Sequence, residues 1–393
     1  MNGKERARLA FNHREADRVP LFELSIDSPT AAYVLGRPAA CGFGGMARGR
    51  LANQALIAGT YREYQRQRTA DEIELWQKLD LDVYVGAIPF PTDPLVPEVV
   101  DENAWRFTDP ATGQWGLWRH LPDTDVYDEV DSSLRRGGLA ELERLTESLE
   151  AAEPSLAEWD FSTVETAQRQ LGDKMIMGYA DVEIGSTFDW AETFLVGLVR
   201  APSLIHRYLD ARLKTTLMVS QALLERGLDG LEGGYDWASA MGPVFSPRHF
   251  REFVFPRLKQ IADLCHRYGA VYVKHTDGNV NSLLDDMVAA GVDAYQAIEP
   301  RAGMDLARLK QQYGGRLTLI GNVDCSTVLV DGPVEAVRAQ TERIIRTAAP
   351  GGGFLLSTSN SVHPGVRPEC YLAMLDTARQ VGTYPIERRA THD

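Results

Sequence analysis

Short apolar runs alternate with longer segments of helical periodicity from residue 174 onward. The longer segments carry apolar residues at three- and four-residue spacing, and most of them end at a glycine, as helices commonly do. Strands that are separated by helical crossovers predict a parallel sheet. The expected strands are 174–180, 228–235, 271–275, 294–299, 317–323 and 352–359, and the expected helices are 246–269, 281–291, 305–314 and 333–352.

Two earlier apolar runs, 19–26 and 81–88, bring the number of predicted strands to eight. Eight parallel strands with intervening helices close into a (β/α)8 barrel, the TIM barrel. An open, doubly wound sheet is the alternative, but no G-x-G-x-x-G follows the first strand and the sequence contains no P-loop. We therefore predict an α/β fold of the TIM-barrel type, formed by residues 1–393 as a single domain.

Residues 100–172 do not follow this alternation. The stretch 104–121 predicts two strands joined by a Pro/Gly turn, and 134–159 predicts a surface helix rich in charge. We interpret the whole segment as an insertion of hairpin and helix between the second and third barrel strands, and not as a separate domain.

Charge and composition narrow the class of protein. The formal net charge is −14 and the basic residues are dispersed, which disfavours a nucleic-acid partner. The start of the chain is charged and no window of about 20 apolar residues occurs, so we expect a cytoplasmic protein without a membrane association. The four cysteines form no Cys-x-x-Cys pair and are expected to be reduced; they are Cys41, Cys265, Cys325 and Cys370.

Polar residues collect directly after the predicted strands. A parallel barrel carries its site at the carboxyl ends of its strands, so these side chains are expected to face one mouth and to bind a small molecule. They are Asp27, Asp181, Glu183, Asp236, His275, Asp277, Glu299, Asn322, Asp324, Asn360 and His363. Tyr179 and Tyr235 are candidates for aromatic walls of the same site, whereas Trp190 and Trp237 are better explained as core residues.

Each of these residues has a structural explanation when it is taken alone. An aspartate after a strand commonly caps a helix or a turn, and a single histidine at a strand end is commonly hydrogen-bonded structure. As a set they are harder to explain in this way, because many acids around one rim repel each other unless a cation or a polar substrate lies among them.

Several long stretches resemble the uroporphyrinogen decarboxylase superfamily. The similarity is carried by "KERARLAFNHREADRVP" near the start, by "VKHTDGNV" in the middle and by "APGGGFLLSTSNSVHPGVRPECYLAMLDTARQVGTYP", and it is densest over residues 226–385. This superfamily comprises the heme-pathway decarboxylase and corrinoid- or thiol-linked methyltransferases on the same barrel. The resemblance implies a (β/α)8 barrel, in agreement with the strand count.

The resemblance is weaker to the true decarboxylase than to the methyltransferase-like and uncharacterised branch. The decarboxylase holds its many-acid substrate with arginines from an R-Q-A-G-R-Y segment. The corresponding stretch here is "ELSIDSPTAAYVLGRP", in which Arg37 is the single cation. Because arginine pairing is the natural way to bind carboxylates, we do not expect uroporphyrinogen to be the substrate.

The zinc methyltransferases of the superfamily carry His-x-Cys on the fifth strand and a second cysteine after the eighth. His275 matches the histidine, Asp277 stands at the first cysteine, and Asn360 or a neighbouring residue stands at the second. The resemblance therefore implies no thiolate site, but an oxygen-rich site for zinc or another divalent ion can be built from His275, Asp277 and one of Glu183, Asp236 or His363. The alternatives are that His275 and Asp277 form a metal-free acid/base pair with no tightly bound cofactor, or that Asp277 caps the helix that follows.

The resulting hypothesis is an enzyme that moves a methyl group from a small O-, N- or S-methylated compound to a corrinoid on a partner protein or to another acceptor. His275, Asp277 and Asp236 are the catalytic candidates, with His275 and Asp277 also the metal ligands. One alternative is a decarboxylase of a small carboxylated or tetrapyrrole-like substrate, and another is a non-catalytic binding barrel. The candidates for substrate binding are Asp181, Glu183, Tyr179, Tyr235, Glu299, Asn322, Asn360 and His363.

Overall fold

The centre of the protein is a curled sheet of seven parallel strands in the order β1-β8-β9-β12-β13-β14-β15. The computed structural model describes residues 1–185 and 188–387. Each of the seven strands lies inside one of the predicted apolar runs, so the α/β class and the parallel sheet are confirmed. The strands are β1 Val83–Tyr84, β8 Met175–Tyr179, β9 Gly230–Gly233, β12 Val271–His275, β13 Ala294–Gln296, β14 Thr318–Val323 and β15 Phe354–Thr358.

The first predicted strand, 19–26, forms isolated bridges instead of a regular strand. Its backbone nevertheless contacts both edges of the sheet: Phe22 N donates to Leu356 O of β15 at 2.9 Å, and Asp82 N, just before β1, donates to Leu21 O at 2.9 Å. The ladder is interrupted because Leu21 N donates to the carboxylate of Asp82 at 2.7 Å. The segment thus lies where the eighth strand of a closed barrel is expected.

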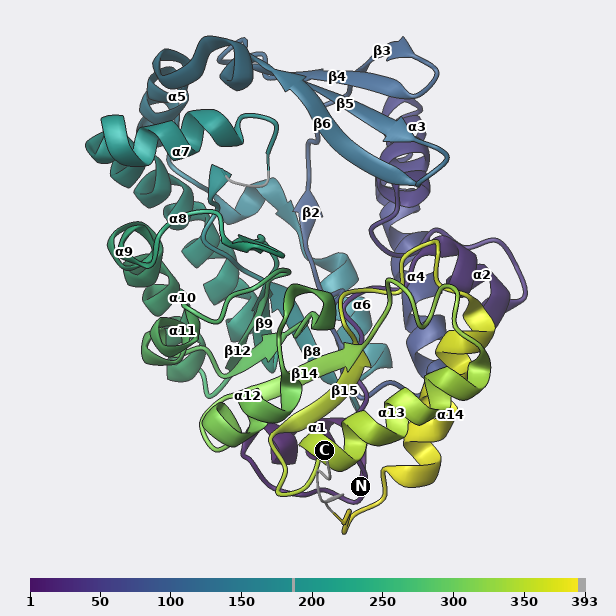
Figure 1. Cartoon of the computed structure of the whole chain (residues 1–393). Coiled ribbons are helices and arrows are strands. Elements are labelled where there is room, and N and C mark those ends of the chain that lie inside the picture. The colour runs from purple at the N-terminus through teal and green to yellow at the C-terminus, as the bar shows by residue number, and fades with distance from the viewer. Residues whose placement is uncertain (186–187, 388–393) are drawn as a thin grey trace.

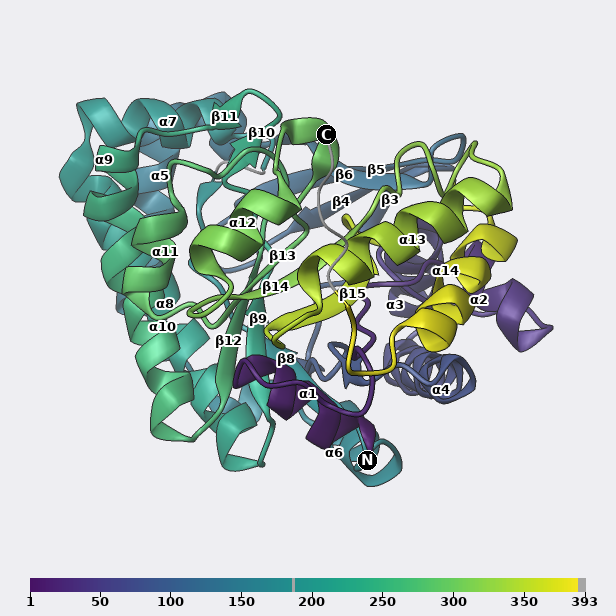
Figure 2. The ribbon, with the colours of Figure 1, turned by 60° about the horizontal axis from the view of Figure 1, so that its bottom comes forward.

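Helices cover the outer face of the sheet. Figure 2 shows α8, α10 and α11 on one side and α4, α13 and α14 on the other. Among the described residues, none of the helices combines the length and the apolar character that crossing a membrane requires. The flanking helices are α4 Tyr61–Leu79, α6 Ser162–Gln170, α8 Pro202–Glu225, α10 Phe255–Arg267, α11 Leu284–Ala290, α12 Leu306–Tyr313, α13 Val334–Ala348 and α14 Pro368–Val381.

The inner face of the sheet is filled by apolar side chains near its amino end. Helix α1 (Gly3–Phe11) packs Ala7, Ala10 and Phe11 against this inner cluster and closes that end (Figure 1). Side chains alternate along a strand, so Val271 and Val273 of β12 face the interior. The next residue with that orientation is His275.

A second, antiparallel sheet has the order β3-β4-β5-β6 and lies in the segment between β1 and β8. The hairpin of β4 (Ala104–Thr108) and β5 (Trp115–Leu121) matches the two predicted strands, and α5 (Ser133–Ala151) matches the predicted helix. β3 (Glu98–Asp101) and β6 (Val126–Ser132) were not predicted, because their polar, largely exposed residues carry little apolar signal. This sheet lies at the end of the molecule opposite α1 (Figure 1).

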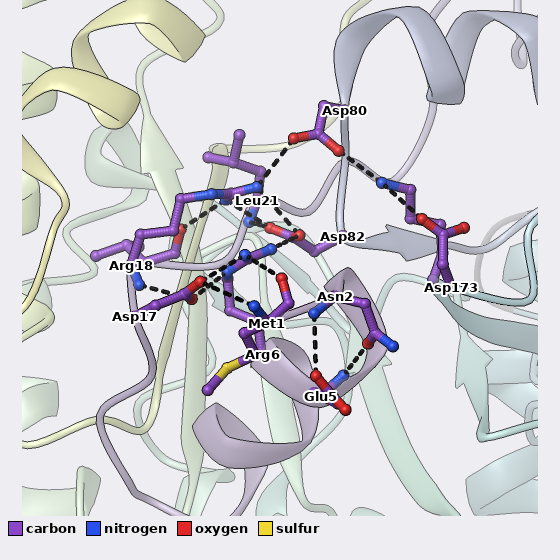
Figure 3. A network of polar contacts seen from close by, with 12 residues as sticks. Met1, Asn2, Glu5, Arg6, Asp17, Arg18, Leu21, Asp80, Asp82 and Asp173 are labelled. Carbon is purple, nitrogen blue, oxygen red and sulfur yellow. Dashed lines mark hydrogen bonds and ion pairs between the residues drawn. The ribbon is translucent and has the colours of Figure 1, made fainter.

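A network of charges joins α1, the first segment and the start of β1 at the amino end (Figure 3). Asp82 is fully buried and accepts from Arg6 Nη1 at 2.5 Å and from Arg18 Nη1 at 2.8 Å. Asp17 accepts from Arg6 Nε at 2.6 Å. The cations are satisfied by several oxygens each, as buried charges must be.

Glu23 makes the stability of the folded protein depend on pH. It is fully buried beside Ser357 and Thr358, and burial raises its pKa from 4.5 to about 8. The folded protein therefore binds a proton here that the unfolded chain releases above its lower pKa, so stability falls as pH rises from about 5 to 8. Between pH 5 and pH 9 we expect the wild-type protein to lose on the order of 3 kcal/mol more unfolding free energy than Glu23→Gln, as measured by urea unfolding. An equal stability difference between the two proteins at both pH values would contradict the assignment.

Candidate functional site at the carboxyl end of the sheet

His275, at the end of β12, is held in one orientation by its neighbours. Its Nδ1 is hydrogen-bonded to Gln296 Oε1 of β13, and Gln296 Nε2 donates to Asn360 O at 2.9 Å. An amide oxygen is an acceptor, so Nδ1 carries the proton of a neutral ring and Nε2 is left with a lone pair. This lone pair is the part of the imidazole that a cation or a proton can use.

Two carboxylates face that nitrogen. His275 Nε2 lies 3.7 Å from Asp236 Oδ1 and 3.8 Å from Asp277 Oδ1. The backbone N–H of Asp277 donates to Asp236 Oδ1 at 2.7 Å, which ties the loop after β9 to the loop after β12. The potential ligand atoms of the three residues all lie within 4.8 Å of one another. We call Asp236, His275 and Asp277 the acidic cluster.

The acidic cluster contains an unsatisfied atom. Asp277 Oδ2 accepts from the side-chain amide of Asn360, whereas Oδ1 is buried and has no hydrogen-bond partner within residues 1–185 and 188–387. Helix α11 begins after Leu283 without a side-chain cap, so Asp277 is not its cap and the capping alternative is wrong. A buried, unpartnered carboxylate oxygen is costly unless something binds it.

The pKa values of Asp277 and His275 are both raised in the acidic cluster. Burial raises the pKa of Asp277 to about 6, and the positive charge on His275 opposes that change. Burial also lowers the pKa of His275, but the carboxylates of Asp277, Asp236 and Glu232 outweigh burial, so its pKa is raised. A proton or a cation is therefore favoured between these groups.

The donor set fits a divalent cation. One imidazole and two carboxylates are ligands that zinc accepts, and three protein ligands with an open position are typical of catalytic zinc sites. Gln296 and Asn360 supply the second layer of hydrogen bonds that orients such ligands. Cys325 lies nearby but is a poor thiolate ligand, because burial raises its pKa to about 11 and it contacts Ser359 Oγ at 3.4 Å.

A cavity of about 320 Å³ lies at the ends of β8 and β9 and against α8. Four of the expected site residues line it: Tyr179, Asp181, Glu183 and Tyr235. Both acids already have cationic partners. Asp181 accepts from the fully buried Lys274 Nζ at 2.5 Å, and Glu183 pairs with Arg212.

The remaining expected residues make hydrogen bonds within the loops. Glu299 accepts from Gly278 N at 3.0 Å and Asn322 Nδ2 donates to Ile298 O at 2.8 Å. His363 Nε2 contacts Cys325 O at 2.9 Å. Glu299 and Asn360 thus adjoin the acidic cluster, whereas Asn322 and His363 contact backbone carbonyl groups of neighbouring loops. The carboxylates of Asp27 and Asp324 accept backbone N–H groups of nearby loop residues, and Trp190 and Trp237 are buried in the core.

Sequence reasoning missed two charged residues, Arg48 and Glu232, and it considered Arg37 in their place. Arg37 lies on the outside and pairs with Asp71 at 2.8 Å and Glu74 at 2.6 Å, so it is not a cation of the mouth. Arg48, which lies over the Phe43 ring at 5.5 Å, is a cation whose charge opposes the burial-raised pKa of Tyr235. Glu232 faces the interior below His275, and burial raises its pKa to about 7. A carboxylate inside the apolar run 228–235 was the available signal for Glu232.

A parallel α/β sheet that presents a polar, acid-rich site at the carboxyl ends of its strands defines a barrel-type enzyme scaffold. The sequence model of the family described as uroporphyrinogen decarboxylase (URO-D) matches residues 183–381. The protein belongs to this family, which confirms the resemblance seen in the sequence.

Relatives of two activities are similar to this chain. A methylcobamide:CoM methyltransferase of Methanosarcina barkeri is 28% identical over 177 residues, which is 44% of this chain and 50% of that protein. A uroporphyrinogen decarboxylase of Chlorobium phaeovibrioides is 28% identical over 178 residues, 44% of this chain and 47% of that protein. The chain spans about half the length of the curated relatives it matches.

A solved structure extends the likeness to the whole fold. A methyltransferase from Methanosarcina mazei superposes with a TM-score of 0.60 at 20% identity, covering 97% of this chain and 99% of that one. The two proteins therefore share the same fold along almost the whole length of both chains.

Proposed function

We propose that this protein is a methyltransferase that moves a methyl group from a small O-, N- or S-methylated compound to a corrinoid carried by a partner protein or to another acceptor. The observation that carries the proposal is the acidic cluster with its unpartnered Asp277 oxygen at the carboxyl end of the sheet. The similarity to a methylcobamide:CoM methyltransferase supports the choice of reaction.

The three members of the acidic cluster would hold a divalent cation, with zinc as the candidate. Such an ion would supply Lewis-acid polarisation of the heteroatom that loses or receives the methyl group. Gln296 keeps His275 Nε2 directed at the cluster, and Asn360 fixes the plane of the Asp277 carboxylate. Asp236 joins the two loops through the Asp277 backbone, so the three side chains are positioned together.

The architecture around the site forms part of the proposal. We take the segment 19–26 to complete a closed (β/α)8 barrel and residues 100–172 to be an elaboration between its second and third strands. The chain would work as a single domain in the cytoplasm, without nucleic acid or membrane partners. The hydrogen bonds of Phe22 and Leu21 to the two sheet edges support the closure.

The proposal is tested by following, through the absorbance of the cobalamin, methyl transfer from a methylated donor to cob(I)alamin or from methylcobalamin to a thiol. We expect the purified protein to contain about one divalent ion per chain, and we expect activity to disappear with a chelator and to return with zinc. Unchanged activity after complete removal of metal would refute the role of the cation. Formation of coproporphyrinogen from uroporphyrinogen would instead assign the protein to the decarboxylases.

A further inference from the structure

A second cavity, of about 210 Å³, lies between helix α4, the carboxyl end of the segment 19–26 and the loop that follows β1. The segment contributes residues 24–26 to its wall, and the loop contributes residues 88–91, which include β2 (Phe90–Pro91). Within the described chain, its lining includes no member of the acidic cluster. What this cavity binds is therefore a separate question from the proposed function.

Aromatic side chains make up much of the cavity wall. Tyr61 and Phe90 meet edge to face with ring centroids 6.1 Å apart, and Trp76 and Tyr84 do so at 5.4 Å. Phe43 is a fifth aromatic residue of the lining. A wall of this composition favours the apolar part of a ligand, and a ring above all.

The two charges in the lining neutralise each other. Arg68 and Glu72 are the charged side chains of the lining in the described chain, and they lie one turn apart on α4. Arg68 Nε donates to Glu72 Oε1 at 3.1 Å, and the two side chains are 20% and 13% exposed. A ligand with a net charge would lose its water here without gaining an unpaired counter-charge, which is costly. The cavity therefore favours an uncharged ligand.

Hydrogen-bond donors in the lining remain unused. Ser25 is 4% exposed, and its Oγ is buried without a hydrogen-bond partner in the described part of the chain. Arg68 Nη2 donates to Gly42 O at 2.9 Å, and this bond together with the one to Glu72 leaves further N–H groups of the guanidinium. An oxygen of the ligand that accepted from Ser25 would remove the cost of its unpartnered hydroxyl.

An acceptor site also remains in the lining. Glu72 Oε1 accepts from Arg68, and Glu72 Oε2 accepts from Tyr84 OH at 3.2 Å. A carboxylate has about four lone-pair sites, so these two donors do not exhaust it. Arg68 and Glu72 together thus offer a donor and an acceptor side by side, which is the complement of an amide group.

We propose that this cavity binds a small uncharged carboxamide that carries an apolar ring. The amide oxygen accepts from Ser25 and Arg68, the amide N–H donates to Glu72, and the ring lies against the aromatic wall. The volume of about 210 Å³ is below the roughly 300–1,000 Å³ that is usual for drug-sized ligands, so the ligand is a single substituted ring or smaller.

The test is calorimetric titration of the whole protein at pH 7 with benzamide, benzoate and benzylammonium, which share one ring and differ in charge. We expect benzamide to bind at least about tenfold more tightly than either ion, because the paired charges of the lining leave no counter-charge for them. Absence of benzamide binding, or benzoate binding as tightly as benzamide, would overturn the inference.

Glu72→Gln converts the prediction into a change of preference. The substitution leaves the charge of Arg68 without its acid, so the affinity for benzoate relative to benzamide should rise at least about tenfold. Glu74→Gln is the matched control on the same helix: Glu74 lies outside the lining and pairs with Arg37 at 2.6 Å and Lys78 at 3.0 Å. It should leave all three affinities unchanged, and an unchanged preference in Glu72→Gln would contradict the proposed site.

Ser25→Ala carries the test if Glu72→Gln folds poorly, because the Ser25 hydroxyl makes no hydrogen bond within the described chain whose loss could destabilise the protein. It should weaken benzamide several-fold, and an unchanged affinity would refute the role of the hydroxyl and with it the proposed binding mode. Benzamide binding in a protein without methyl transfer would uphold this site and remove the proposed function, and methyl transfer without benzamide binding would do the reverse.

Discussion

Asp277→Asn is expected to abolish divalent-metal binding and to lower methyl transfer at least about 100-fold while the fold remains intact. The Asp277 carboxylate presents its unpartnered Oδ1 3.8 Å from His275 Nε2. Asparagine has nearly the same shape, but it removes the negative charge that would bind the cation. Loss of a ligand that provides several kcal/mol of charge stabilisation corresponds to a rate effect of about this size. Elemental analysis and the cobalamin assay measure the two effects separately.

The control for this change is Asp305→Asn at the start of α12. Asp305 caps that helix by accepting from Ala307 N at 2.9 Å and Arg308 N at 3.1 Å, and asparagine caps helices about equally well. It should alter neither metal content nor activity. Full metal content and full activity in Asp277→Asn would show that the aspartate is structural and that the acidic cluster is not the reaction centre.

Lys274→Met is expected to produce the largest loss of stability of any single change discussed, about 3–5 kcal/mol. The side chains of Lys274 and Asp181 are both fully buried and pair at 2.5 Å. Removing the ammonium leaves a carboxylate in the interior with two backbone N–H donors, Tyr235 N and Val182 N at 2.8 Å each. Equilibrium unfolding in urea at pH 7 gives the free-energy difference directly.

A second change separates charge from packing at this position. In the double variant Lys274→Met with Asp181→Asn the uncompensated charge is absent, so we expect it to be more stable than Lys274→Met alone. Lys259→Met removes an exposed lysine whose ion pair with Asp263 spans one helical turn, and it should change stability by less than about 0.5 kcal/mol. If the double variant were no more stable than the single one, the loss would come from lost packing instead.

The parallel sheet could be predicted from the sequence because each strand is a short apolar run that ends at a change of periodicity. The acidic cluster was accessible for the same reason: Asp236, His275 and Asp277 follow two such runs, and strands that are neighbours in a barrel bring their ends together. The pairing of Asp181 with Lys274 was not accessible. It depends on side-chain orientation across strands, and Lys274 reads in the sequence as one more polar residue at the rim.

Arg48 escaped prediction for a different reason. It lies in the short π-helix Met46–Leu51, directly after a glycine loop, and the sequence of this segment carries no periodicity that indicates which way its side chains point. That loop is held by Asp27, which accepts from Phe43 N at 2.7 Å and Gly44 N at 3.1 Å. Such contacts join residues by tertiary geometry alone, so the surroundings of Arg48 could be established only from the structure.

The charge network of Arg6, Arg18 and Asp82 lies at the amino end of the sheet, and the acidic cluster lies at its carboxyl end. The residues of the charge network are thus separate from those of the proposed site, and substitutions in one set should be nearly independent of those in the other. An engineer could exchange α1 and its partners for a more heat-resistant version and keep the substrate preference.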